Sequence, residues 1–90
     1  MRPSAAVKHD LRQEPRIPAH GVVMLEYEGR SLAAQLLDLS VSGFRAGHDF
    51  VEFHTGSTVG FRHPGASGRA RVVWNRISGT SVESGFFIIS

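Results

Sequence analysis

Two arginines and a short polar segment are the residues of this chain best suited to bind a ligand. Arg12 and Arg16 lie four residues apart in the segment RQEPR, so their side chains can point the same way on either a helix or a strand. A guanidinium is planar, stays charged, stacks on rings and binds phosphate or the O6/N7 edge of guanine bidentately. The pair would suit a ligand with several phosphates and guanines. The alternative is a solvated basic tail with no partner.

The polar segment DLSVSG places Asp38, Ser40, Ser42 and Gly43 at the end of an apolar stretch. The Asp38 carboxylate can accept hydrogen bonds from the N1 and N2 donors of a guanine, and the Ser40 hydroxyl can bond a phosphate oxygen or a base edge. Gly43 permits a positive φ and a close backbone approach. The alternative is that Asp38 and Ser40 only cap a turn through hydrogen bonds to the backbone.

The elements that must position these residues are strands. From residue 21 onward apolar side chains recur with a period of two, as in Val23, Leu25 and Tyr27. Residues 31–39 are apolar on both sides, which predicts a central strand. About six strands are expected, over residues 21–27, 31–39, 44–46, 57–62, 68–76 and 80–89, with a loop over 47–56 and turns over 28–30, 63–68 and 77–79. Such a set usually removes its exposed edges by closing into a barrel.

Ahead of these strands, residues 1–20 are expected to form a flexible arm, because Pro3, Pro15 and Pro18 each remove a backbone donor and disfavour a helix. The predicted organisation is therefore an arm over 1–20 that carries the two arginines and one barrel domain over 21–90. A domain of this size has a modest core and little room for a deep catalytic cleft. A binding module is favoured over an enzyme.

Composition excludes several classes of function. The formal net charge of +2 is too small for a protein that binds bulk nucleic acid, and the absence of cysteine excludes disulfides and thiolate metal sites. The five histidines, at positions 9, 20, 48, 54 and 63, lack metal-ligand spacing. No apolar run reaches the length of a signal peptide or a membrane span, so we expect a soluble, cytoplasmic protein that does not act on membranes.

The order of these features resembles the PilZ domain family. An Arg-x-x-x-Arg arm is followed by a strand hairpin, by Asp-x-Ser-x-x-Gly, and by ARVVWNRISGTSVESGFFI, which is similar to the closing hairpin of the family. The resemblance covers residues 11–89. It implies a six-stranded antiparallel β-barrel that binds the bacterial second messenger cyclic di-GMP and needs no other cofactor.

By this resemblance, Arg12 and Arg16 would clamp the ligand, Asp38 and Ser40 would hold a guanine edge, and Gly43 would admit the ligand against the backbone. Ser42 stands where many members have glycine, and it could narrow the loop or add a hydrogen bond. Trp74 alternates with Ala70 and Val72, which indicates a core position. At the barrel mouth its ring could instead border a guanine.

The mechanism implied is switching: the ligand would order the arm over the barrel and so signal to an unidentified protein partner. Two alternatives stay open. Small barrels also bind single-stranded nucleic acid on aromatic platforms, but Phe44, Phe86 and Phe87 stand where core residues are expected. The chain could also be a module of PilZ shape that binds only protein.

Overall fold

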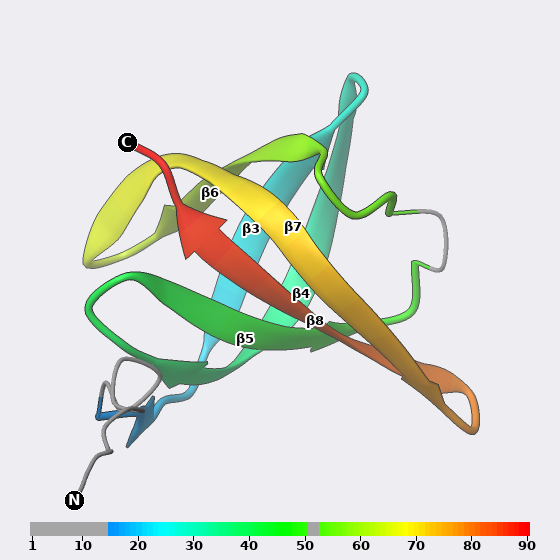
Figure 1. Ribbon diagram of the computed structural model, residues 1–90, viewed down its shortest axis with the longest axis horizontal. Helices are drawn as coiled ribbons and strands as arrows, with labels where there is room; N and C mark the ends of the chain where they lie inside the picture. The colour runs from blue at the N-terminus through cyan, green and yellow to red at the C-terminus, as the bar shows by residue number, and fades with distance from the viewer. Residues whose placement is uncertain (1–14, 51–52) are drawn as a thin grey trace, which may run out of the picture.

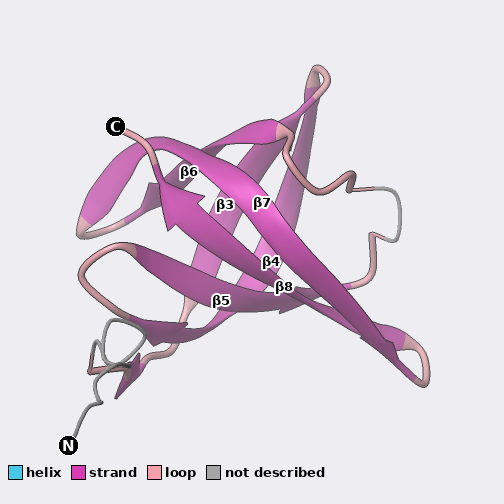
Figure 2. Ribbon diagram, viewed as in Figure 1, coloured by secondary structure: helices cyan, strands magenta, loops and turns pink. Residues whose placement is uncertain are grey.

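Seven strands and no helix make up the part of the chain that the structure, a computed structural model, describes: residues 15–50 and 53–90 (Figures 1 and 2). All the predicted strands are present, and those expected at 44–46 and 68–76 are longer than predicted. The strands are β2 (Ile17–Pro18), β3 (Val22–Tyr27), β4 (Arg30–Leu39), β5 (Gly43–His48), β6 (Thr58–His63), β7 (Ala66–Ser78) and β8 (Ser81–Ile88).

Six of these strands close on themselves. Each pairs antiparallel with its neighbour in the order β4-β3-β6-β7-β8-β5, and the additional pairing of β4 with β5 completes the ring. β2 lies outside this ring, and among the described strands it pairs with the end of β4 alone, where Figure 1 shows it beside the arrowhead of that strand. The prediction of a six-stranded antiparallel barrel is confirmed.

Tight turns set the register of the hairpins. Glu28 and Gly29 have φ values of 52° and 79° and connect the paired residues Tyr27 and Arg30, which is the two-residue turn whose twist matches that of the strands. The β7–β8 turn is tighter than predicted, because Ile77 still pairs with Val82 and only Gly79 and Thr80 remain outside the strands.

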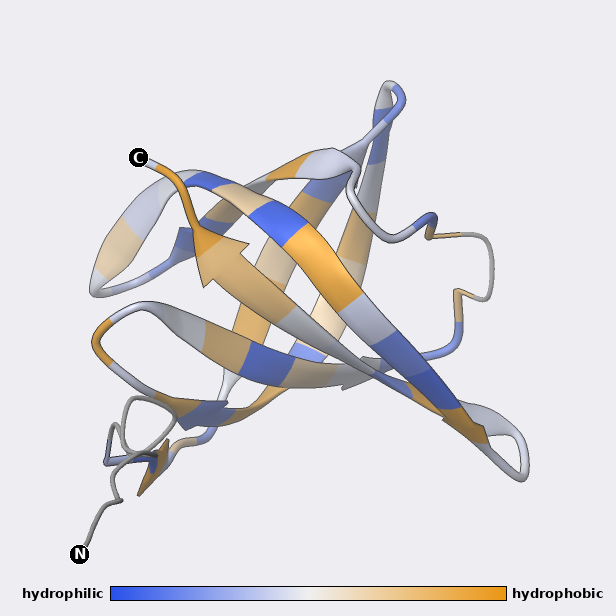
Figure 3. Cartoon of the chain, viewed as in Figure 1, coloured by the Kyte–Doolittle hydropathy of each residue, from blue (hydrophilic) through white to orange (hydrophobic). Residues whose placement is uncertain are grey.

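The core follows the predicted alternation. Leu25 and Val72 are fully buried, and the stacked rings of Phe44 and Phe86 have centroids 4.8 Å apart. Along β7, Figure 3 shows apolar and polar residues following one another, as expected when one face of a strand lines the interior. The other buried apolar residues are Val23, Tyr27, Ala34, Leu36, Ala46, Phe53, Val59, Phe61, Ala70 and Val82.

Two β-bulges interrupt the alternation. In β4, Leu36 pairs with Ala46 but Asp38 pairs with Arg45, so Leu37 is one extra residue. In β7, Val72 pairs with Phe86 but Trp74 pairs with Gly85, so Val73 is one extra residue. An extra residue re-aims the side chains beyond it. Both Asp38 and Trp74 therefore leave the inward face on which Leu36 and Val72 lie.

A series of hydrogen bonds connects β5, β8 and β7, beginning at His48. His48 was predicted to lie in a loop but is the last residue of β5. The amide of Phe50 donates to His48 Nδ1 at 3.0 Å, so in the neutral ring Nε2 carries the proton and donates to Ser84 Oγ at 2.7 Å. Ser84 donates to Asn75 Oδ1 at 2.6 Å, and Asn75 Nδ2 donates to the carbonyl of Phe53 at 3.1 Å. A second proton on the ring would face the Phe50 amide donor.

Acid should therefore destabilise the barrel at this point. Burial lowers the pKa of His48 from its ordinary value of 6.5, and the charge of Asp49 opposes this shift. Because the unfolded chain then binds a proton more readily than the folded one, we expect the free energy of unfolding to fall as the pH drops below about 6.5. Urea unfolding of the wild type and of His48→Gln between about pH 5 and 7 checks this. If the free energy of unfolding falls with pH equally steeply in the two proteins, the prediction is contradicted.

Candidate functional site

The end of β4 is where the predicted site residues meet. β3 pairs with β4 only as far as Gln35, and β2 takes over the same edge, with Ile17 opposite Leu39 and Pro18 opposite Asp38. The Ala19 amide also donates to the Leu37 carbonyl at 3.0 Å. Residues 15–20, expected to belong to an unpacked arm, are thus joined to the barrel by backbone pairing. This pairing places Arg16 beside the polar segment.

Arg16 contacts both Asp38 and Ser40. Its Nε and Nη2 lie 3.2 Å and 3.1 Å from Asp38 Oδ1, and its Nη1 lies 3.5 Å from Ser40 Oγ. The Asp38 side chain is 10% exposed and the Arg16 side chain 46% exposed. The structure therefore brings together one arginine of the RQEPR segment with the acid and the hydroxyl of DLSVSG. Arg12, the other arginine of that pair, lies outside the described residues.

Ser40 also shapes the turn that follows β4. Both its amide, at 2.8 Å, and its hydroxyl, at 3.4 Å, donate to the Gly43 carbonyl. The carbonyl of Ser42 accepts a hydrogen bond from the Ile88 amide at 2.7 Å, which ties the turn to the end of β8. Ser40 thus caps the turn through hydrogen bonds to the backbone, which was the alternative considered from the sequence. The Asp38 carboxylate instead forms ion pairs with arginines.

Gly43 has a packing role that sequence reasoning missed. It is buried and its φ is not positive, so the left-handed conformation that glycine permits is not used here. A Cβ at this position would overlap the carbonyl oxygen of Phe86 and lie 3.1 Å from its carbonyl carbon. The close approach that Gly43 allows here is that of β5 to β8.

Trp74 lies on the outer face of the barrel, 36% exposed, because of the bulge in β7. The core position suggested by its alternation with Val72 is wrong. Its indole covers Gly85 on β8 so closely that a Cβ on Gly85 would overlap Nε1 and Cε2 of the ring. Trp74, Gly85, Arg45 and Asp38 are successive partners across β7, β8, β5 and β4, so they form one row over the outer face.

Two further residues of this face were not recognised in the sequence. Phe87 was expected in the core but is 47% exposed, since it follows the inward-facing Phe86 on β8. Arg45 was not singled out, although its Nε donates to Asp38 Oδ2 at 2.8 Å. The available signal was its position between Phe44 and Ala46, which share the opposite face of β5.

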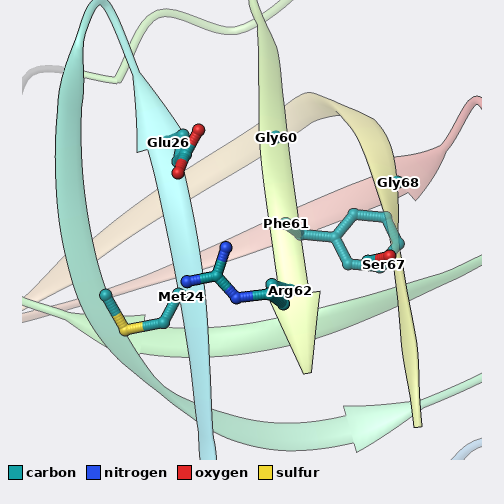
Figure 4. A pocket seen from close by; sticks show the side chains of 7 residues that line it. All are labelled: Met24, Glu26, Gly60, Phe61, Arg62, Ser67 and Gly68. Carbon is teal, nitrogen blue, oxygen red and sulfur yellow. The ribbon is translucent and has the colours of Figure 1, made fainter. Parts of the chain in front are cut away.

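The hollow in Figure 4 lies on a different part of the barrel. Its volume is about 300 Å³ and its walls come from β3, β6 and the start of β7: Met24, Glu26, Gly60, Phe61, Arg62, Ser67 and Gly68. None of the predicted site residues lines it. No helix in the described part of the chain has the length and apolarity that crossing a membrane requires.

Comparison with known protein families gives a match over most of the chain. The family model described as PilZ domain matches residues 10–87, which span the RQEPR segment, the DLSVSG segment and the strands up to β8. No curated protein matches the chain. PilZ domains are in general receptors for cyclic di-GMP and not enzymes. On this match, which covers most of its length, the chain belongs to the PilZ domain family.

Proposed function

We propose that this protein is a cyclic di-GMP receptor whose N-terminal arm and β4–β5 turn bind the ligand together and pass the signal to a partner protein. The N1 and N2 donors of one guanine would bond to the Asp38 carboxylate. The guanidinium groups of Arg16 and Arg12 would bind phosphate or the O6/N7 edge. Ligand contacts from the arm and the barrel would then fix the arm on the barrel surface.

The contact of Arg16 with Asp38 and Ser40 carries this proposal. Arg16 stands 22 positions from Asp38 and 24 from Ser40 in the sequence, yet its guanidinium lies within 3.5 Å of polar atoms of both. A single small ligand can reach both motifs only if they are adjacent. Ser42 lies in the turn between β4 and β5, Gly43 begins β5, and Trp74 is the far end of the row that begins at Asp38.

Calorimetric titration of the whole chain with cyclic di-GMP tests the proposal. Saturable binding that GTP, GMP and short RNA oligomers do not reproduce is the expected result. Tighter binding to RNA, with a steep dependence on salt, would instead favour the nucleic-acid alternative. The exposed rings of Trp74 and Phe87 are the observation that makes RNA a necessary control.

Trp74 is proposed to stack against a guanine. Its indole packs flat against β8 because Gly85 has no side chain. Removing the ring in Trp74→Ala should weaken cyclic di-GMP binding by about tenfold, because stacking of a base on an aromatic ring is worth roughly 1–3 kcal/mol. Gly85→Ala should have a similar effect, since the added Cβ displaces the indole. Calorimetry measures both affinities, and tryptophan fluorescence reports the displacement.

Gly47→Ala is a matched control on the neighbouring strand, where the added Cβ would meet only Leu37 Cδ1 at 3.8 Å and the Val82 carbonyl oxygen at 3.9 Å. It should bind as the wild type does. Unchanged affinity in Trp74→Ala would remove this residue from the proposed ligand contacts.

A further inference from the structure

Five charged side chains of alternating sign run across the outer face of the barrel. In order they belong to Arg16, Asp38, Arg45, Glu83 and Arg76, from the arm, β4, β5, β8 and β7. Beyond Asp38, Arg45 Nη1 lies 3.4 Å from Glu83 Oε1, and Arg76 Nη2 lies 2.7 Å from the same oxygen. We call this series the charge ladder.

The two arginines on Asp38 are held differently. Arg45 extends from the middle of a barrel strand, is 34% exposed, contacts Oδ2 at 2.8 Å and has a second anchor in Glu83. Arg16 directly precedes β2, a strand of two residues, is 46% exposed and contacts Oδ1 at longer distances. Its other contact, with Ser40, is 3.5 Å long. Of the two, Arg45 is the more firmly fixed.

A guanine edge that bonds to Asp38 must share the carboxylate with these two groups. Each carboxylate oxygen has two acceptor positions, so Oδ2 can accept from Arg45 and from one guanine donor together. Oδ1 can accept the second guanine donor when Arg16 turns from Asp38 towards the ligand. Both donors are met at once only if the plane of the carboxylate is held in place, and Arg45 is the group that holds it.

We infer that Arg45, itself braced by Glu83, is a positioning residue that sets the specificity of the site for guanine through Asp38. The inference rests on the proposed function. If it is right, Arg45 affects how strongly the site prefers guanine over other bases. A residue that only supports the fold would affect the binding of all bases alike. Hypoxanthine distinguishes a positioning role from a purely structural one. It lacks the N2 amino group of guanine and so has only one of the two donors that Asp38 would bind.

The experiment compares the affinities of cyclic di-GMP and cyclic di-inosine monophosphate in the wild type, Arg45→Gln and Arg71→Gln. Arg71 is an exposed arginine of β7 outside the charge ladder and serves as the control. In Arg45→Gln we expect cyclic di-GMP to bind about tenfold more weakly, the effect of one charge-assisted hydrogen bond. The inosine analogue should lose less, so that the ratio of the two dissociation constants falls towards one. Arg71→Gln should keep the ratio of the wild type.

A parallel loss for both ligands in Arg45→Gln, or no loss, would overturn the inference while leaving the proposed function intact. Failure of the wild type to bind cyclic di-GMP would overturn the proposed function and the inference with it. Glu83→Gln is a second variant in case Arg45→Gln does not fold, because it leaves both Asp38 and Arg45 in place. It should also lower the ratio, by a smaller factor, and an unchanged ratio in Glu83→Gln would count against the bracing of Arg45.

Discussion

Replacing Arg16 with glutamine should weaken cyclic di-GMP binding by about two orders of magnitude while leaving the barrel folded. Glutamine keeps much of the length of the side chain but loses the charge and the planar array of donors that suits phosphate and guanine. The loss is expected to be large because Arg16 contacts both Asp38 and Ser40, so a ligand bound to these two residues would also lie within reach of its guanidinium.

The cost of this change to stability should be small. The ion pair with Asp38 is lost, but Arg16 is 46% exposed, and exposed pairs contribute roughly 1 kcal/mol or less. Asp38 keeps its contact with Arg45, so its carboxylate is not left buried without a partner. A thermal melt within a few degrees of the wild type, together with the loss of affinity, is the combination that supports a direct role in binding.

Arg62→Gln is the matched control for Arg16→Gln. Arg62 is an exposed arginine of β6 and lines the hollow of Figure 4, away from the end of β4. The same change there should leave affinity unaltered. If Arg16→Gln binds cyclic di-GMP as tightly as Arg62→Gln does, the proposed clamp is wrong. Arg12→Gln extends the test to the other arginine of the pair and is expected to weaken binding sharply as well.

The strands of the barrel could be predicted from the sequence because the patterns that favour them are local. Val23, Leu25 and Tyr27 recur with a period of two and are buried, whereas Val22 before them and Glu26 between them are exposed, as expected for a strand that buries one face. The Glu28-Gly29 turn was likewise readable, since glycine accepts the positive φ that a two-residue hairpin needs. Both features depend on residues that are adjacent in the chain.

The outer face could be predicted only in part, because its arrangement depends on pairing between distant strands. Alternation alone places Asp38 with Leu36 and Trp74 with Val72, and both placements fail because each strand has one extra residue opposite its partner. A bulge is fixed by the register of both strands, which a single stretch of sequence does not reveal. The role of Arg45 was missed for the same reason, since Asp38 and Glu83 flank it only after β4, β5 and β8 have paired.

Gly43 of the PilZ motif has a structural role that was not predicted from the sequence. Gly43 was expected to give the ligand access to the backbone. In the structure its missing side chain lets β5 pack against β8, with Gly43 opposite Phe87 and the Phe86 carbonyl oxygen where a Cβ would stand. Binding tests on Gly43 variants therefore need a measurement of folding beside them.

Gly43→Ala should destabilise the barrel more than replacement of Arg16, Arg45 or Trp74 does. The added Cβ meets backbone atoms and not the end of a movable side chain, so β5 and β8 must separate locally. We expect a loss of about 3 kcal/mol in the free energy of unfolding, at the upper end of what overpacking usually costs, and a fall in Tm of roughly 10–20 °C for a domain of this size. Urea unfolding followed by the fluorescence of Trp74 measures it.

Gly47→Ala makes the same chemical change four residues further along the same strand. Its Cβ would be in ordinary van der Waals contact with Leu37 and Val82, and its φ is not positive, so its stability should stay within about 1 kcal/mol of the wild type. If Gly43→Ala loses much more free energy of unfolding than Gly47→Ala, glycine is required at position 43 because of the close contact between β5 and β8. If Gly43→Ala instead unfolds like the wild type but no longer binds cyclic di-GMP, the packing explanation is wrong and Gly43 acts at the ligand.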